Sequence, residues 1–303
     1  MVNNEIVKKF NKIFHNEEAN FYDQQHLEIL REGDNWKNFC QRYLEHLSRP
    51  ITVLDVGSGT GFVPAILAQY LTPQDKVICA DISLKMLMIA KEKLKKFSCQ
   101  FEFVETDCEE MPFLANTSID LITVNSVLHH LPGYHKFLEE ANRLLKSEGI
   151  ICIAHEPNRK FFKNFLLVFI FRLLSYFSVK LSKFKKSIQN QKIVLTDEIN
   201  EQLVKEGIIK SGQKLNDQEI QALVDIWSPT VSSKINKEAG FDPLLIKKEY
   251  FPTSKLLLLR TYNHLGKIDS SKNFFLRYLD KLFSNLFPRS GSSFWLIIKK
   301  QGL

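Results

Sequence analysis

Hydrophobic residues in the middle of the chain form five short runs separated by longer amphipathic stretches. The runs are ITVLDV (51–56), KVICAD (76–81), FEFVET (101–106), SIDLITVN (118–125) and GIICIAH (149–155). Their length and β-branched content predict strands, and the spacing within 61–71, 84–97 and 134–146 predicts helices. This alternation predicts a parallel, doubly wound sheet, in which ligands bind beyond the carboxyl ends of the strands.

The two ends of the chain follow other patterns. Residues 1–50 carry apolar positions at helical spacing and predict an N-terminal helical cap that ends at Pro50. Residues 157–238 predict a second helical region, rich in basic and aromatic side chains. In 239–303 the pattern predicts an extended LLIKKEYF (244–251), a helical insert at about 253–290 and a last strand in SSFWLIIKK.

Composition narrows the class of protein. The chain has 303 residues, of which 44% are hydrophobic and 25% charged, and a chain of this size folds on apolar burial alone. Its five cysteines are odd in number and show no C-x-x-C spacing, so neither a disulfide framework nor a zinc site is predicted. We expect a reducing, cytoplasmic setting, because no secretory signal opens the sequence and no apolar run has the length of a membrane span.

The net charge of +7 has one source. Residues 157–190 contain eight basic side chains and no acidic one, whereas the rest of the chain carries 33 basic and 34 acidic residues. The pattern indicates a local basic surface and argues against a uniformly nucleic-acid-like protein.

A glycine-rich turn follows the first predicted strand, in Asp55-Val-Gly57-Ser58-Gly59-Thr-Gly61. Glycines allow positive φ and a close approach of the backbone to a ligand, and free N–H groups at a helix start favour an anionic group. A dinucleotide-binding turn would need G-x-G-x-x-G, and its last position here is Phe62, which argues against NAD.

Acidic residues end the next two predicted strands. Asp81 lies twenty residues past Gly61, where a carboxylate accepts hydrogen bonds from the two ribose hydroxyls of a nucleoside. Asp107, followed by Cys108, ends the third strand, where a side chain can meet the amino group of adenine. A turn-forming aspartate is the structural alternative for either residue.

These segments together resemble one family. D-V-G-S-G-T-G, A-D-I-S-x-x-M-L, the acid after the third strand and S-I-D-L-I-T-V-N-S-V-L-H-H-L resemble the class I S-adenosylmethionine-dependent methyltransferases, in the branch that acts on small molecules, quinones and lipids. The likeness covers about residues 50–156 and the terminal strand. It implies an α/β fold with a Rossmann-like, seven-stranded mixed sheet, a last antiparallel strand and helical lid inserts.

The resemblance also implies roles for individual residues. S-adenosylmethionine is the implied cofactor, S-adenosylhomocysteine the product, and no metal is required. The turn of Gly57, Ser58, Gly59 and Gly61 would hold the methionine part, Asp55 would order that turn or reach the cofactor's ammonium, and Asp81 would hold the ribose. The adenine and sulfonium contacts would come from Ile82, Met86, Asp107, Cys108, Asn125 and Ser126, with Tyr22 closing over the site.

Some methyl acceptors need a base as well as alignment. The candidates are His129 and His130, just after the fourth strand, and His155 with Glu156, just after the fifth. Each of them has a structural alternative as a hydrogen-bonded residue. The tetrapeptides and cysteine loops of nucleic-acid-methylating relatives are absent from the corresponding positions, since Ser126 follows Asn125 and Cys152 lies inside a predicted strand.

The basic-aromatic segment 157–190, with seven phenylalanines, bears on the acceptor. Such a segment suits a membrane interface with anionic lipid or a clamp on a hydrophobic or lipid-linked acceptor, and a buried lid helix is the structural alternative. One rival interpretation is an RNA (tRNA) methyltransferase that uses these residues as a platform, and another is a non-catalytic nucleotide-binding module. The continuous apolar face argues against nucleic acid as a partner, and the intact glycine turn with Asp81 argues against the non-catalytic module.

Overall fold

A single mixed sheet organises the computed structural model, which describes residues 3–26, 32–169, 185–229, 238–264 and 274–302. The strand order is β3-β2-β1-β4-β5-β7-β6. Strands β1 (Thr52–Val56), β2 (Lys76–Asp81), β3 (Gln100–Glu105), β4 (Ile119–Asn125) and β5 (Leu145–Pro157) are parallel. Strand β7 (Ser293–Lys299) runs antiparallel to both β5 and β6 (Lys255–Tyr262). The predicted seven-stranded α/β fold with an antiparallel last strand is confirmed.

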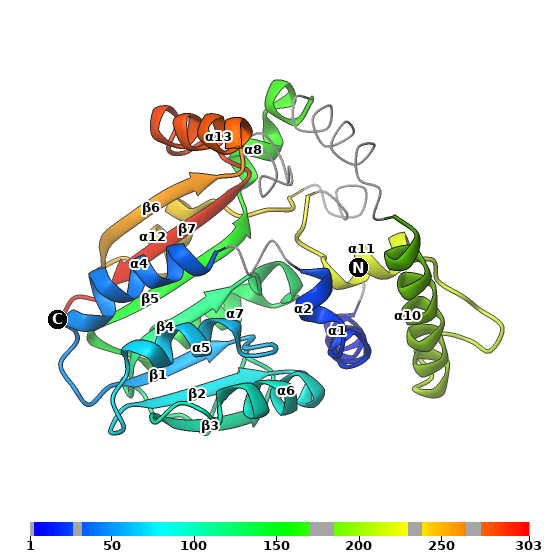
Figure 1. Ribbon diagram of the computed structural model, residues 1–303, viewed down its shortest axis with the longest axis horizontal. Helices are drawn as coiled ribbons and strands as arrows, with labels where there is room; N and C mark the ends of the chain where they lie inside the picture. The colour runs from blue at the N-terminus through cyan, green and yellow to red at the C-terminus, as the bar shows by residue number, and fades with distance from the viewer. Residues whose placement is uncertain (1–2, 27–31, 170–184, 230–237, 265–273, 303) are drawn as a thin grey trace.

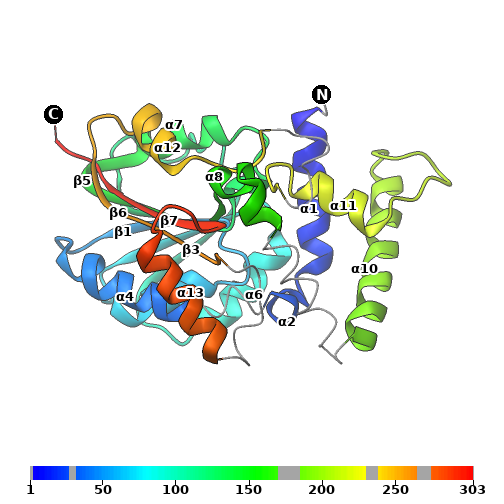
Figure 2. The same cartoon turned by 90° about the horizontal axis from the view of Figure 1, so that it is seen from above.

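Helices cover both faces of this sheet (Figure 2). One face packs against α4 (Gly33–Tyr43), α5 (Phe62–Leu67) and α6 (Leu84–Leu94), and the other against α7 (Tyr134–Leu144) and α12 (Pro243–Tyr250). Successive strand residues point to opposite faces, so Val53 belongs to one buried cluster and Leu54 to the other. Short 3₁₀ turns complete the core at η1 (Leu44–His46), η2 (Ala68–Tyr70) and η3 (Leu128–His130).

The N-terminal helices lie beyond the carboxyl ends of the parallel strands (Figure 1). Helix α1 (Asn4–Glu18) and the short α2 (Tyr22–Gln25) stand between the sheet and the pair α10 (Lys185–Lys205) and α11 (Asp217–Val224). Phe10 and Phe14 of α1 pack against Leu195, Ile199 and Ile220 in a third apolar cluster. The ligand-bearing edge of the sheet is therefore covered by α1 and α2 from the N-terminal region together with α10 and α11 from the second helical region.

One prediction for the C-terminal region is wrong. Residues 244–251 were expected to be extended, but 244–250 lie in helix α12. The strand lies later, in β6, inside the segment expected to be a helical insert. Asp242 caps this helix by accepting from the N–H of Leu244, and Pro243 occupies the first turn, where its missing N–H costs nothing. The run LLLLR lies in β6, which pairs with β7 at the edge of the sheet.

The basic-aromatic segment is described only in part. It begins with α8 (Arg159–Lys163), and the side chains of Phe165, Leu166 and Phe169 are 84%, 63% and 55% exposed. Residues 170–184, which hold much of the predicted membrane-facing or lid segment, lie outside the described residues. Helix α13 (Phe274–Leu286) follows β6 within the second insert.

Two further expectations concern the chain as a whole. Each of the five cysteines is a buried free thiol. Within the described residues, no helix has the length and apolar character needed to cross a membrane.

Candidate active site

The glycine turn between β1 and α5 depends on left-handed backbone. Gly57, Gly59 and Gly61 have φ of +62°, +51° and +82°. A Cβ on Gly57 would lie 2.4 Å from Cγ2 of Val127, so the loop after β4 leaves no room for a side chain there. A Cβ on Gly59 would meet only a backbone oxygen at 4.0 Å, which leaves open space beside this residue. The turn is thus fixed on one side and open on the other.

Asp55 lies behind the turn. Its carboxylate accepts a hydrogen bond from Oγ1 of Thr123 on β4, and its carbonyl accepts one from Oγ of Ser58 at 2.9 Å. Burial raises the pKa of Asp55 to about 7, although the hydrogen bonds from Thr123 and Ser58 oppose the rise. Of the two expected roles, this position suits ordering of the turn, because Asp55, Ser58 and Gly61 are not among the residues that line the adjoining cavity.

Asp81 occupies the end of β2 and reaches the turn. Its Oδ2 accepts the N–H of Gly59 and its Oδ1 the N–H of Ser83, both at 2.8 Å. Burial raises the pKa of Asp81, and the two backbone hydrogen bonds oppose that rise. A carboxylate has about four acceptor positions, so two remain for the hydroxyls of a ribose.

The first cavity opens where the carboxyl ends of β1, β2, β3 and β4 meet. It is lined by ten of the residues predicted to contact the cofactor, which are Tyr22, Gly57, Gly59, Asp81, Ile82, Met86, Asp107, Cys108, Asn125 and Ser126. Asn11 of α1 lines the same cavity, and its Oδ1 is buried with no hydrogen-bond partner among the residues that the structure describes. A nucleoside amino or hydroxyl group would supply the missing donor, so the cavity fits S-adenosylmethionine.

Lys8 is an unexpected neighbour of Asp107. Its Nζ lies 2.6 Å from Oδ2 of Asp107 and 2.9 Å from Oε2 of Glu109. Burial opposes the charge of Lys8, but the hydrogen bonds and charges of these two acids raise its pKa above the ordinary value. The acid after β3 is therefore already paired with an ammonium, and its predicted contact with adenine stays a prediction.

A second cavity adjoins the first. His15, Tyr22, Ser126 and His130 line both. Five of the eight histidines in the chain surround the second cavity, namely His15, His26, His129, His130 and His155. The other lining groups include Glu18, Asp225, Phe14 and Phe162, so the cavity combines titratable groups with aromatic rings.

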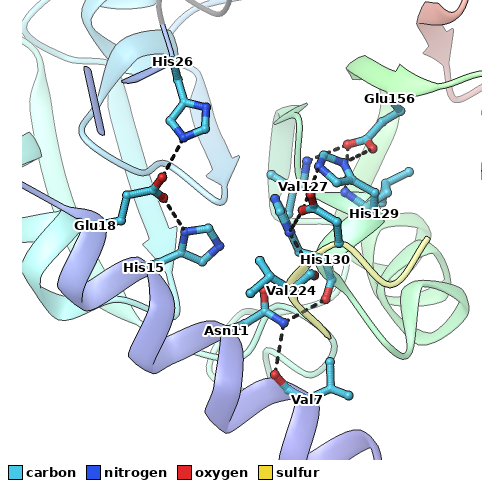
Figure 3. Close-up of polar contacts among 12 residues, drawn as sticks. Val7, Asn11, His15, Glu18, His26, Val127, His129, His130, Glu156 and Val224 are labelled. Carbon is cyan, nitrogen blue, oxygen red and sulfur yellow. Dashed lines mark hydrogen bonds and ion pairs between the residues drawn. The ribbon is translucent and has the colours of Figure 1, made fainter. Parts of the chain in front are cut away.

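Glu156 holds the loop after β4 in place. It is fully buried, and its Oε1 accepts the N–H groups of Val127 at 2.6 Å and Leu128 at 2.8 Å. Its Oε2 lies 2.8 Å from Nδ1 of His129 (Figure 3). The prediction of a base does not fit Glu156, which lines neither cavity and is surrounded by the groups that it binds.

His130 and His155 each reach the second cavity from a different strand end. The Nδ1 of His130 lies 3.1 Å from Oδ1 of Asp225 and 3.2 Å from the carbonyl of Val224, at the end of α11. Burial alone would lower the pKa of His130, but the hydrogen bond and charge of Asp225 outweigh it and raise the pKa. His155 sits at a bulge in β5 with φ of +60°, and its Nδ1 meets Oη of Tyr262 at 2.8 Å.

The histidine cluster also bears on metal binding. His129, His130 and Asp225 each place one nitrogen or oxygen within 4.8 Å of the others. A hydrogen bond between His130 and Asp225 accounts for their 3.1 Å separation, and the ring of His129 is oriented by Glu156. We therefore interpret the cluster as a hydrogen-bonded one.

Several residues of the two cavities were missed by the sequence reasoning. Lys8, Asn11 and His15 line the first cavity from one face of α1. These residues are three and four positions apart, so they share one face of the helix. A polar Asn11 between the apolar positions is a signal that this face contacts another group. Asp225 lies in a helical region remote in sequence and left no such signal.

Known proteins are similar to part of this chain. Residues 54–153 match the family described as "Methyltransferase domain". The chain is 28% identical over 159 residues to a demethylmenaquinone methyltransferase of Staphylococcus carnosus, a match that covers 52% of this chain and 65% of that protein. It is 32% identical over 149 residues to a ubiquinone/menaquinone biosynthesis C-methyltransferase of Brucella anthropi, covering 47% of this chain and 56% of that protein.

Each match covers only part of this chain and part of the relative. A demethylmenaquinone methyltransferase of Lactococcus lactis is 29% identical and is covered to 74% of its length, with 62% of this chain. A solved SAM-dependent methyltransferase of Aquifex aeolicus aligns with a TM-score of 0.36 at 27% identity, over 41% of this chain and 64% of that one. The likeness to the Aquifex aeolicus structure is too partial to support the fold beyond what the strand order shows. Residues 54–153 therefore carry a methyltransferase domain, and the chain is similar over part of its length to methyltransferases of quinone biosynthesis.

Proposed function

We propose that this chain transfers the methyl group of S-adenosylmethionine to an oxygen or carbon of a small, hydrophobic or lipid-linked ring compound such as a quinol. The observation that carries the proposal is that two adjoining cavities share Ser126 and His130 as lining residues. The first has the residues of a nucleoside site, and the second has room for an acceptor beside it. Relatives with similar sequence include a demethylmenaquinone methyltransferase and a C-methyltransferase of ubiquinone and menaquinone biosynthesis.

The protein's part in such a reaction is alignment. When bound, S-adenosylmethionine supplies a methyl group already activated on a positively charged sulfur. Gly57 and Gly59 would hold the methionine part, Asp81 the ribose, and Asn125 with Ser126 would flank the sulfonium. Holding the acceptor in line with the methyl group can contribute roughly 7–11 kcal/mol to the lowering of the barrier.

The test is methyl transfer to defined acceptors. The purified chain is incubated with S-adenosylmethionine and either reduced short-prenyl naphthoquinones or unmodified tRNA, and the products are measured by mass spectrometry. We expect the quinols to gain one methyl group and S-adenosylhomocysteine to form in equal amount. Methylation of tRNA with none of the quinols would overturn the proposal in favour of the RNA interpretation.

We also propose a peripheral contact with anionic membranes through the start of the basic-aromatic segment. Phe165, Leu166 and Phe169 are exposed, and Arg159, Lys160 and Lys163 precede them in the chain. Exposed apolar side chains beside basic ones favour an anionic lipid surface. Flotation with phosphatidylserine vesicles tests this contact. We expect salt-sensitive association that the triple change of Phe165, Leu166 and Phe169 to Ser abolishes, and equal flotation of both proteins would refute it.

A further inference from the structure

We propose that the second cavity binds the acceptor through an acidic ring hydroxyl, and that His130, oriented by Asp225, takes the proton from that hydroxyl. The inference rests on the proposed methyl transfer and adds to it the side chain that takes the proton from a phenol or enol acceptor. It also assigns Asp225 as a positioning residue, which the sequence did not indicate.

His15, Tyr22, Ser126 and His130 belong to the walls of both cavities, so a molecule in the second cavity lies against the residues that border the first. Phe14, Tyr22 and Phe162 supply aromatic surface for a flat ring. A ring placed there presents its substituents to the histidines.

Every histidine of this cavity has one ring nitrogen engaged by a partner within the protein. His26 Nε2 lies 2.8 Å and His15 Nδ1 3.6 Å from the Glu18 carboxylate (Figure 3). On the opposite side, His129 Nδ1 meets Glu156 at 2.8 Å and His155 Nδ1 meets Tyr262 at 2.8 Å.

His130 is the histidine best placed for proton transfer, because it alone among the three after β4 and β5 lines both cavities. Its Nδ1 has two acceptors, Oδ1 of Asp225 at 3.1 Å and the carbonyl of Val224 at 3.2 Å. A carbonyl can only accept, so the proton of the neutral ring resides on Nδ1. The Nε2 atom of that tautomer is the acceptor, which is the state that a general base requires.

The electrostatic surroundings of His130 favour its protonated form. The charged and titratable groups near it come from every side: His15 on α1, at a ring separation of 5.1 Å; His129, at 4.1 Å; Asp81 from β2; Glu156 from β5; and Asp225 after α11. Three of these five are carboxylates, and two are imidazoles. An imidazolium formed at His130 is thus stabilised, and it in turn stabilises an oxyanion on the acceptor.

The proton and electron balance is simple. The acceptor's O–H proton moves to Nε2 of His130, and the oxygen or the adjacent ring carbon of the resulting anion forms a bond with the methyl carbon. The bond between that carbon and the sulfur breaks, and its electron pair stays on sulfur as the neutral thioether of S-adenosylhomocysteine. If carbon is methylated, the ring then loses the proton from that carbon, and in either case His130 returns its proton to water.

The experiment uses 4-nitrophenol as the probe, because its phenolate absorbs visible light and its phenol does not. The full chain, saturated with S-adenosylhomocysteine, is titrated with the probe over a range of pH and the phenolate absorbance is recorded. We expect the bound probe to ionise at a pH about one unit lower than in water, a tenfold shift. His130→Gln and Asp225→Asn are the test variants. His135→Gln is the matched control, because His135 is an exposed histidine outside both cavities.

The outcomes separate this inference from the proposed function. Loss of the shift in His130→Gln and its reduction in Asp225→Asn, with each protein saturated with S-adenosylhomocysteine and His135→Gln like the wild type, would support it. An equal shift in all four proteins, or no probe binding beside the bound product, would overturn it while leaving methyl transfer intact. If calorimetry shows that the wild type does not bind S-adenosylhomocysteine, the proposed function itself fails.

Discussion

Replacement of Glu156 distinguishes a residue that holds the loop after β4 from one that performs chemistry. In Glu156→Ala the N–H groups of Val127 and Leu128, and Nδ1 of His129, lose the carboxylate that they contact at 2.6, 2.8 and 2.8 Å. Each buried polar group left without a partner costs about 1–3 kcal/mol. Because the three share one acceptor, their effects are not additive, and we expect a loss of about 3–6 kcal/mol in the free energy of unfolding.

Such a loss is a large share of the roughly 5–15 kcal/mol that stabilises a folded domain. Glu156→Gln is the matched control, since its amide oxygen still accepts the two backbone N–H groups, and we expect it to lose no more than half as much. Urea unfolding followed by circular dichroism measures both variants. A Glu156→Ala protein within about 1 kcal/mol of the wild type would show that this network does not hold the loop, and the argument against a catalytic Glu156 would lose its basis.

Three further predictions follow from the same contacts. Gly57→Ala places a Cβ 2.4 Å from Val127 at φ +62°, so it should weaken S-adenosylhomocysteine binding in calorimetry. Gly207→Ala, at φ +68° with no atom within 4 Å of the added Cβ, should lower the free energy of unfolding by only the roughly 1–2 kcal/mol of a left-handed residue. Equal effects of the two variants on binding would contradict the close packing at Gly57. Lys8→Ala leaves Glu109, whose side chain is 1% exposed, without its ammonium partner, so it should lower the free energy of unfolding in urea by roughly 3–5 kcal/mol. The control Lys12→Ala should lower it by less than about 1 kcal/mol, because its partner Glu105 is 33% exposed. Burial opposes ionisation of Glu18, but His15 and His26 outweigh it and lower its pKa to about 2 from 4.5, so its contribution to stability is complete above pH 4.5 and is lost as the pH falls towards 2. Wild type should therefore lose more stability than Glu18→Gln in urea unfolding between about pH 5 and pH 3, and parallel losses would be evidence against the pairing.

The sequence predicted the parts of the site that are local to strand ends. Gly57 and Ser126 follow β1 and β4 directly, and Asp81 ends β2. Parallel strands bring their carboxyl ends to one edge, so strand prediction alone brings these residues together. The seven-stranded mixed sheet with an antiparallel last strand was implied by the family resemblance, and the order of the strands comes from the structure. The same reasoning failed at 244–251, because LLIKKEYF suits either state by composition, and the cap at Asp242 with Pro243 decided for the helix.

The remaining site residues depend on tertiary contacts that no local pattern encodes. Lys8 reaches Asp107 across about a hundred residues of chain, and Asp225 reaches His130 from the end of α11. Glu156 was predicted to face the ligand because it ends β5, but the bulge at His155 turns it towards the loop of Val127 instead. Such outcomes follow from the packing of whole elements, which one sequence does not determine locally.

The most direct measurement is the binding of S-adenosylhomocysteine to the wild type and to Asp81→Ala, by titration calorimetry. Two hydrogen bonds from ribose hydroxyls to a carboxylate contribute about 1.5–3 kcal/mol each, so the variant should bind at least about 10²-fold more weakly. Asp120→Ala, which removes a carboxylate at the other end of the sheet that binds Thr52 and Lys146, should bind like the wild type. A wild-type chain that shows no heat of binding, or an Asp81→Ala protein with unchanged affinity, would contradict the assignment of the cofactor site.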